Sequence, residues 1–230
     1  MKQYKHLFFD LDRTLWDFDL NSAETLIEAV SHFKLEGLIS NTGLFIQNFN
    51  IHNNFVWEMY RQKKMDKHTV RYERFRLALE PYNITDKAFI DKMQAFYLAN
   101  APLKKNLFDN CIEVLDYLFR KYNLYIVTNG FYETQLKKMQ SSDIDRFFKK
   151  VFTSDKLGYS KPDSKIFEYA IKSVNARKCE SLFIGDDFVN DIEGPKKFGI
   201  DQVWLKTNHV TCKLEPTYTI ESLQELKTFL

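Results

Sequence analysis

The hydrophobic and polar positions of this 230-residue chain follow two alternating patterns. Short apolar runs, rich in aromatic and β-branched residues, stop abruptly at polar residues or glycine, which is typical of buried parallel strands. These runs occupy residues 6–9, 124–127, 151–152, 182–184 and 202–205. Helical spacing, as at Ile112, Leu115 and Leu118, fills the intervals between the later runs. The alternation predicts an α/β fold with a doubly wound parallel, Rossmann-like sheet, helices on both faces and a ligand beyond the carboxyl ends of the strands.

A long insertion interrupts this alternation. More than 100 residues separate the first strand from the second, far more than one crossover helix requires. From residue 17 to 100 the pattern is almost wholly helical, with Phe45 and Phe49 on one stripe. We therefore predict an all-helical cap subdomain of four or five helices at 17–100, inserted into a catalytic α/β core domain formed by 1–16 and 101–230.

Two acidic residues, Asp10 and Asp12, follow the first strand directly. Residues two apart project to one side of an extended chain, and neighbouring carboxylates repel each other unless a cation or a proton lies between them. The alternative is a turn that caps the following helix, a role that Asp and Thr14 suit. The pair alone therefore indicates a cation site without establishing one.

Two further segments offer groups that can bind an anion. The second strand ends in Thr128, Asn129 and Gly130, which provide a hydroxyl, an amide and backbone N–H groups, although Asn-Gly is also a common turn. Lys161 precedes Pro162, and we predict this proline at the first position of a helix, with the lysine held outside it. Such a lysine can meet a phosphate, and a solvated loop lysine is the alternative.

The strand at 182–184 is followed by Gly185 and three carboxylates, Asp186, Asp187 and Asp191. Helix capping explains one of these acids but not all three beside a second acidic pair. Mg²⁺ prefers a few carboxylates together with waters and a substrate phosphate. Taken in order, the four segments are much more specific than any one of them, and they predict a magnesium and phosphate site at one edge of the sheet.

These four segments resemble the motifs of the haloacid dehalogenase superfamily, and the resemblance covers nearly the whole chain, including a helical cap after the first motif. It implies that Asp10 is the nucleophile and Asp12 the general acid and base. It also implies that Thr128 and Asn129 hold phosphate and that Lys161 steadies both the nucleophile and the phosphate.

The resemblance further implies one Mg²⁺ ion, bound by Asp10, by the backbone carbonyl of Asp12 and by Asp186. Asp187 and Asp191 would orient these ligands without binding the ion themselves. The reaction that it implies is hydrolysis of a phosphate monoester through an aspartyl phosphate. Dehalogenases of the superfamily lack the second acid and need no Mg²⁺, so Asp12 favours phosphate ester hydrolysis. Two competing hypotheses are a phosphomutase, which would also use both acids, and a non-catalytic binding protein.

The sequence says less about the substrate. Arg13 stands where many members of the superfamily carry a small residue. We expect its guanidinium to point away from the metal, and the alternative is that it reaches toward the substrate. Trp16 and Phe18, together with residues 72–75, resemble the branch that contains pyrimidine nucleoside 5′-monophosphatases. These two rings either stack on a base or pack in the core. We therefore expect nucleoside 5′-monophosphates as substrates, with a sugar phosphate or a broad range of small phosphate esters as the alternative.

Composition and charge limit the classes of binding partner and the cellular compartments that we expect for this protein. The chain carries 33 Lys and Arg against 31 Asp and Glu, a net charge of +2 that does not call for a nucleic acid polymer as partner. The seven basic residues at 61–76 either attract small anions or form a solvated face.

No apolar run approaches the roughly 20 residues that span a bilayer, and the run before Asp10 lacks the features of a signal peptide. Cys111, Cys179 and Cys212 form no C-x-x-C pair and fit reduced thiols. We therefore expect a cytoplasmic enzyme, monomeric or homodimeric, that acts on a small phosphate ester.

Overall fold

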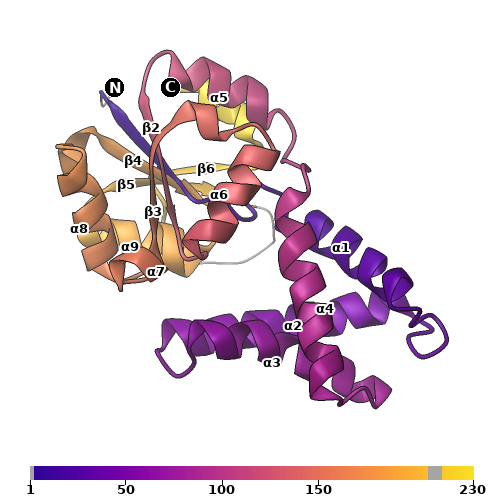
Figure 1. The fold of residues 1–230 in the computed structure, drawn as a ribbon. Coiled ribbons are helices and arrows are strands. Elements are labelled where there is room, and N and C mark those ends of the chain that lie inside the picture. The colour runs from indigo at the N-terminus through magenta and orange to yellow at the C-terminus, as the bar shows by residue number, and fades with distance from the viewer. Residues whose placement is uncertain (1–2, 207–213) are drawn as a thin grey trace. The chain divides into compact units, whose positions relative to one another are not determined.

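The computed structural model describes residues 3–206 and 214–230. It divides into two compact units (Figure 1), one formed by Met1–Phe18 with Lys105–Leu230 and the other by Asp19–Lys104. The first unit contains a parallel sheet, and the second is helical. Each unit has a hydrophobic core made of its own residues.

The sheet unit is built on parallel strands, of which six lie in the described ranges in the order β3-β2-β1-β4-β5-β6. Their bounds are β1 (His6–Phe9), β2 (Asn123–Thr128), β3 (Phe148–Thr153), β4 (Ser181–Gly185), β5 (Asp201–Leu205) and β6 (Tyr218–Ile220). β1 is central, with Phe9 opposite Ile126 of β2 and Ile184 of β4. The predicted parallel α/β fold is confirmed, and β6 is an additional strand that the apolar pattern did not reveal.

Side chains of β1 alternate between two cores, one on each face of the sheet. Leu7 and Phe9 pack with residues of α5 (Cys111–Phe119) and α6 (Tyr132–Ser141). Phe8 points to the other face and packs in a cluster with residues of α8 (Ser164–Ser173). Helices therefore cover both faces, as the doubly wound arrangement requires. The shorter helical segments of this unit are α7 (Ser154–Leu157), α9 (Gly194–Phe198), a π-helical turn (Phe188–Glu193) and 3₁₀ turns at Asp145–Phe147, Lys178–Glu180 and Leu223–Thr228.

The helical unit is formed by four α-helices, because the amphipathic stripes in its sequence bury aromatic residues against one another. These helices are α1 (Phe18–His32), α2 (Thr42–Arg61), α3 (Lys67–Leu79) and α4 (Lys87–Asn100), with 3₁₀ turns at Glu80–Tyr82 and Ala101–Leu103. Phe45 and Phe49 of α2 are fully buried in this core. Tyr97 of α4 donates a hydrogen bond to Ser22 Oγ of α1 at 2.8 Å, which ties the first helix to the last.

The basic segment at residues 61–76 of the helical unit does not form a uniformly exposed charged face. Arg74 is buried, donates from Nη1 to Asn53 Oδ1 at 3.2 Å and lies with its guanidinium carbon 4.8 Å from the centroid of the Tyr97 ring. Arg61 and Arg76 form ion pairs with glutamates on their own helices. Part of the segment's positive charge is therefore used within the unit.

Two other expectations can be compared with the structure. No helix in the parts of the chain that the structure describes has the length and apolar character needed to cross a membrane. Cys111 is a buried free thiol and Cys179 an exposed one, whereas Cys212 lies outside the described residues.

Candidate active site

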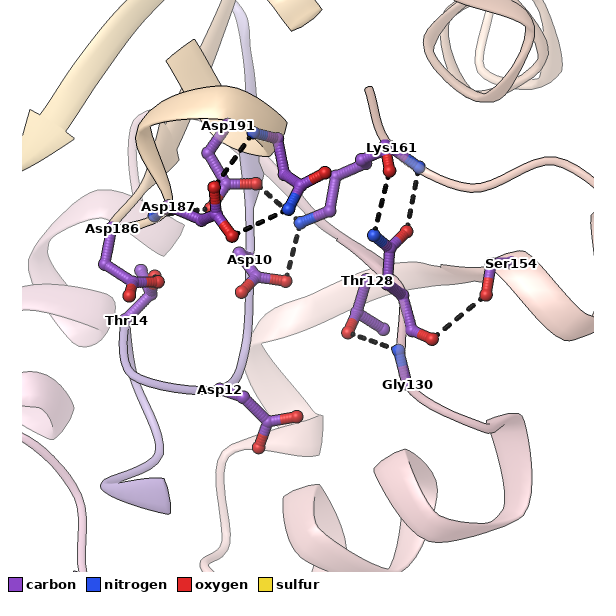
Figure 2. A network of polar contacts seen from close by, with 12 residues as sticks. Asp10, Asp12, Thr14, Thr128, Gly130, Ser154, Lys161, Asp186, Asp187 and Asp191 are labelled. Atoms are coloured by element: carbon purple, nitrogen blue, oxygen red, sulfur yellow. Dashed lines mark hydrogen bonds and ion pairs between the residues drawn. The ribbon is translucent and has the colours of Figure 1, made fainter. Parts of the chain in front are cut away.

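The predicted site residues gather at the carboxyl ends of three adjacent strands (Figure 2). Asp10 follows β1, Thr128 ends β2 and Asp186 follows β4. The chain order changes direction at β1, since β2 lies on one side of it and β4 on the other. Ligands of doubly wound sheets bind beyond the carboxyl ends of the strands at such a point.

Lys161 lies at the centre of the polar network in Figure 2. Its side chain is 2% exposed, and Nζ donates to Asp10 Oδ1 at 2.7 Å and to Asp191 Oδ1 at 2.6 Å. Burial lowers the pKa of Lys161, but the two carboxylates outweigh burial and raise it overall. The side chain is therefore an ammonium group that offsets part of the negative charge around it.

Asn129 fixes the backbone of Lys161. Its Nδ2 donates to the Lys161 carbonyl oxygen at 3.0 Å, and its Oδ1 accepts from the Lys161 N–H at 2.8 Å. Ser154 Oγ donates to the Asn129 carbonyl oxygen at 3.0 Å and anchors this turn in its place. In this arrangement the amide side chain positions the lysine, and Nδ2 keeps a second hydrogen with which the expected phosphate contact of Asn129 could be made.

Thr128 presents a hydroxyl group with a defined direction. It is 2% exposed, and its Oγ1 accepts from the Gly130 N–H at 3.1 Å and from Gln135 Nε2 at 2.9 Å. A hydroxyl has two acceptor lone pairs and one hydrogen to donate. Since both lone pairs are used, the group that Thr128 can offer to an anion is its O–H.

Three carboxylates form a compact acidic cluster. Asp10, Asp186 and Asp191 each contribute one oxygen atom, and these atoms all lie within 4.8 Å of one another. Burial raises the pKa of each, and for Asp186 burial together with the charges of Asp10 and Asp187 raises it to about 7. Lys161 lies between two of these carboxylates, and oxygen atoms crowded in this way suit a divalent cation with oxygen ligands such as Mg²⁺.

The loop after β4 shapes this cluster. Asp187 accepts from two backbone N–H groups of the π-helical turn Phe188–Glu193, at 3.0 and 3.1 Å, and so caps it. Asp191 lies in that turn, where its Oδ2 accepts from the Asp187 N–H at 3.1 Å while its Oδ1 binds Lys161. A Cβ atom at Gly185 would lie 2.4 Å from Asp191 Oδ2, so the strand approaches Asp191 too closely for any side chain.

Asp186 is held from two sides. Thr14 Oγ1 donates to Asp186 Oδ1 at 3.2 Å, so the threonine of the first motif contacts the acidic cluster. Trp204 of β5 donates from Nε1 to the Asp186 carbonyl oxygen at 3.0 Å. Trp204 was not predicted as a site residue, because its run of apolar residues indicates only a strand.

Asp12 lies apart from the acidic cluster, and Figure 2 shows its carboxylate directed away from Asp10. Lys138 Nζ lies 2.5 Å from Asp12 Oδ1, and Gln135 Nε2 donates to Asp12 Oδ2 at 2.9 Å. Neither α6 residue was predicted from the sequence. The sequence feature that could have identified them is a pair of polar side chains three positions apart, on the helix face that also buries Met139.

Arg13 and the two aromatic candidates for substrate contact, Trp16 and Phe18, pack closely together. Arg13 has φ of 61°, in the left-handed region that favours glycine, and its guanidinium carbon lies 4.6 Å from the centroid of the Phe18 ring. Trp16 is 1% exposed, and Lys138 Nζ lies 4.2 Å from the centroid of its ring. Of the two aromatic candidates, Phe18 is the partly exposed residue.

Comparisons with known proteins identify the family and the fold to which this chain is similar. The family model described as haloacid dehalogenase-like hydrolase matches residues 7–205. HAD-hydrolase YfnB of Bacillus subtilis is 30% identical, with 98% of this chain and 95% of the relative covered. The pyrimidine 5′-nucleotidase PynA of Streptococcus pneumoniae is 31% identical over 97% of this chain and 93% of the relative. A glyceraldehyde 3-phosphate phosphatase of Pyrococcus abyssi is 31% identical over 88% and 81%. A crystal structure of YfnB bound to magnesium superposes with a TM-score of 0.89 at 28% identity, covering 99% of this chain and 98% of that one.

Proposed function

Because this chain belongs to the haloacid dehalogenase-like hydrolases, we propose that it is a Mg²⁺-dependent phosphatase that hydrolyses nucleoside 5′-monophosphates through an aspartyl phosphate. The observation that carries the proposal is the environment of Asp10. This carboxylate is buried, bound through one oxygen to Lys161 and clustered with Asp186 and Asp191 at the edge of the sheet. Nucleophile, charge compensation and cation ligands thus converge on one point.

The first half of the reaction forms a covalent intermediate on Asp10. Lys161 holds Oδ1, so Oδ2 is the atom that attacks phosphorus. The new bond joins Oδ2 to phosphorus, the bond from phosphorus to the leaving-group oxygen breaks, and that oxygen takes a proton from the Asp12 carboxyl group. Lys161 and the Thr128 O–H bind phosphoryl oxygens during this step.

The second half releases the phosphate. A water molecule attacks phosphorus and gives its proton to the Asp12 carboxylate, while the bond between phosphorus and Asp10 Oδ2 breaks. Inorganic phosphate leaves, Asp10 is again a carboxylate and Asp12 again carries its proton. Each residue therefore returns to its starting state after one turnover.

The acidic cluster is the proposed Mg²⁺ site. Asp10, Asp186 and the backbone carbonyl of Asp12 are the proposed ligands, and Asp187 and Asp191 orient them. The bound ion supplies Lewis-acid stabilisation that offsets the repulsion between an anionic nucleophile and an anionic phosphoryl group. The support for this assignment is that one oxygen atom of each of the three carboxylates lies within 4.8 Å of the others, and that Asp10 and Asp191 are buried beside Lys161.

The substrate class rests on similarity and on Phe18. PynA is named as a pyrimidine 5′-nucleotidase, and its similarity extends over 97% of this chain. Phe18 is partly exposed at the start of α1, and a base that stacks on its ring would take the place of the Arg13 guanidinium or share the ring with it. A sugar phosphate is the second candidate, because the Pyrococcus abyssi glyceraldehyde 3-phosphate phosphatase is as similar over a shorter range.

The decisive experiment measures phosphate release from nucleoside monophosphates and sugar phosphates, with Mg²⁺ and with EDTA. We expect Asp10→Asn to reduce kcat about a thousandfold or more, because it removes the nucleophile while preserving shape. Asp109→Asn, at an exposed aspartate of the same unit, is the matched control and should leave the rate unchanged. Full activity of Asp10→Asn, or no release from any ester by a folded protein that binds Mg²⁺, would refute the proposal.

A further inference from the structure

Two residues of α6 hold both oxygen atoms of the Asp12 carboxylate. Lys138 Nζ lies 2.5 Å from Oδ1, and Gln135 Nε2 lies 2.9 Å from Oδ2. Gln135 and Lys138 are only 1% and 5% exposed, so both donors are buried groups directed at one carboxylate. Gln135 Nε2 also donates to Thr128 Oγ1 at 2.9 Å, and an amide nitrogen carries the two hydrogens that this requires.

The positions of both donors are fixed by their surroundings. Lys138 Nζ lies 4.2 Å from the centroid of the buried Trp16 ring, a distance at which an ammonium is attracted to the ring face. Gln135 lies against Gly130, where an added Cβ atom would come within 2.4 Å of the Gln135 amide. The glycine after β2 thus leaves the space that the glutamine side chain occupies.

The direction in which Asp12 is held matters for the reaction. Asp12 lies two residues further from the end of β1 than Asp10, and Figure 2 shows it turned away from the acidic cluster. In an in-line displacement the leaving group departs on the side of phosphorus opposite to Asp10. A carboxylate held outside the cluster is placed where it can exchange a proton with the leaving-group oxygen. A carboxylate rotated inward would instead add a further negative charge beside Asp186 and Asp191.

We propose that Gln135 and Lys138 are positioning residues that keep the Asp12 carboxylate beside the leaving-group oxygen. This inference rests on the proposed phosphatase function. Two donors from the same helix bind both oxygen atoms of the Asp12 carboxylate, and the Gln135 amide also links that carboxylate to the Thr128 hydroxyl.

The test compares substrates whose leaving groups need a proton to different degrees. A nucleoside 5′-monophosphate has an alkoxide leaving group, whereas p-nitrophenolate departs with little need of protonation. The variants are Lys138→Met and Gln135→Met, with Lys137→Met and Gln140→Met as controls at exposed positions of the same helix. Values of kcat/KM are compared, because they report the first phosphoryl transfer before hydrolysis of the intermediate.

We expect kcat/KM for the nucleotide to fall about tenfold or more in both α6 variants, and that for p-nitrophenyl phosphate to stay within about threefold. Across substituted phenyl phosphates, log kcat/KM should depend more steeply on the leaving-group pKa in the Lys138→Met and Gln135→Met variants than in the unaltered protein. Lys138→Arg keeps a donor for Asp12 and should recover part of the nucleotide activity. The two control variants should match the unaltered protein on every substrate.

Three results would overturn the inference or its premise. An equal loss on all substrates, together with a lower unfolding temperature, would assign Gln135 and Lys138 a structural role only. Unchanged activity on all substrates would show that Asp12 needs neither donor. If the unaltered protein releases phosphate from no ester, the phosphatase function itself fails, and this result is distinguishable because it appears without any substitution.

Discussion

Gly185 shows how much the site depends on the absence of one side chain. A Cβ atom there would lie 2.4 Å from Asp191 Oδ2 and 2.5 Å from Asp191 Cβ, both far inside contact distance. We predict that Gly185→Ala displaces Asp191 from Lys161, lowers the free energy of unfolding by about 1–3 kcal/mol and reduces phosphate release. Urea unfolding and initial rates measure the two effects.

A matched control for this substitution is Gly37→Ala in the helical unit, since nothing lies within 4 Å of a Cβ atom at that position. We expect its unfolding free energy to stay within about 0.5 kcal/mol of the unaltered protein. If Gly185→Ala were as stable and as active as this control, the close approach of β4 to Asp191 would be wrong.

Residues of the site differ in how visible they are in the sequence. Asp10, Thr128 and Asp186 directly follow or end apolar runs, so their place at the sheet edge follows from strand prediction alone. Lys138 lies inside a helix, and its partner Asp12 is 126 positions away. No local spacing encodes that pair, because the contact exists only once β1 and β2 are adjacent and α6 follows the second of them.

At the scale of the elements, the start of α8 corrects one prediction. Pro162 was expected at the first helical position, but α8 begins at Ser164 and its N-cap is Asp163, whose Oδ1 accepts from the Lys165 N–H at 3.0 Å. An aspartate directly before a helix satisfies an unpaired N–H group, and here it decides the boundary. Lys161 remains outside the helix, but it is a buried residue and not a solvated one.

We predict that Asp163→Ala lowers the free energy of unfolding by about 1 kcal/mol, because the first turn of α8 loses its side-chain acceptor. Asp163→Asn keeps an acceptor oxygen at the same place and should cost only a few tenths of that amount. Chemical denaturation of the two variants side by side measures the difference. Equal stability of the alanine and asparagine variants would show that the cap contributes nothing.

The elements themselves were predictable to different degrees. β1, β2 and β4 are nearly continuous apolar runs because both of their faces are buried, and that pattern is distinctive. β6 has three residues, of which only Ile220 is buried, so its sequence resembles that of a loop. It becomes a strand by pairing with β5, and such tertiary pairing is not visible in a window of a few residues.

At the scale of the whole molecule, the site carboxylates all lie in the sheet unit. Asp10, Asp186 and Asp191 belong to this unit, while the helical unit has a core formed entirely from residues within 19–104. The electrostatic cost of burying the acidic cluster therefore falls on one unit alone. A change in pH or in divalent cation concentration should alter the unfolding of the sheet unit and leave the helical unit as an internal reference.

The sign of this pH dependence follows from the direction of the shift. Burial and the neighbouring Asp10 and Asp187 raise the pKa of Asp186 to about 7, above the roughly 3.9 of an aspartate in an unfolded chain. The folded state then binds the Asp186 proton more tightly than the unfolded chain does. The contribution of this proton to the free energy of unfolding is fully present below about pH 4 and is lost as the pH rises toward 7. Glu180 has the opposite shift, with a pKa lowered to about 2 by hydrogen bonds from Arg177 and Lys5, and it acts only at lower pH.

We therefore predict that, in EDTA, the unfolding temperature of the sheet unit falls between pH 5 and pH 8. Mg²⁺ should raise that temperature, and its effect should grow with pH to on the order of 5 °C at pH 8, because protons compete with the cation for the same carboxylates. Asp186→Asn removes one of the three carboxylates whose pKa is raised, so it should weaken the pH dependence and reduce the effect of Mg²⁺. Calorimetry at the two pH values, with and without the ion, provides the measurement. A Mg²⁺ effect of equal size at both pH values would mean that the cation does not bind among the carboxylates that follow β1 and β4.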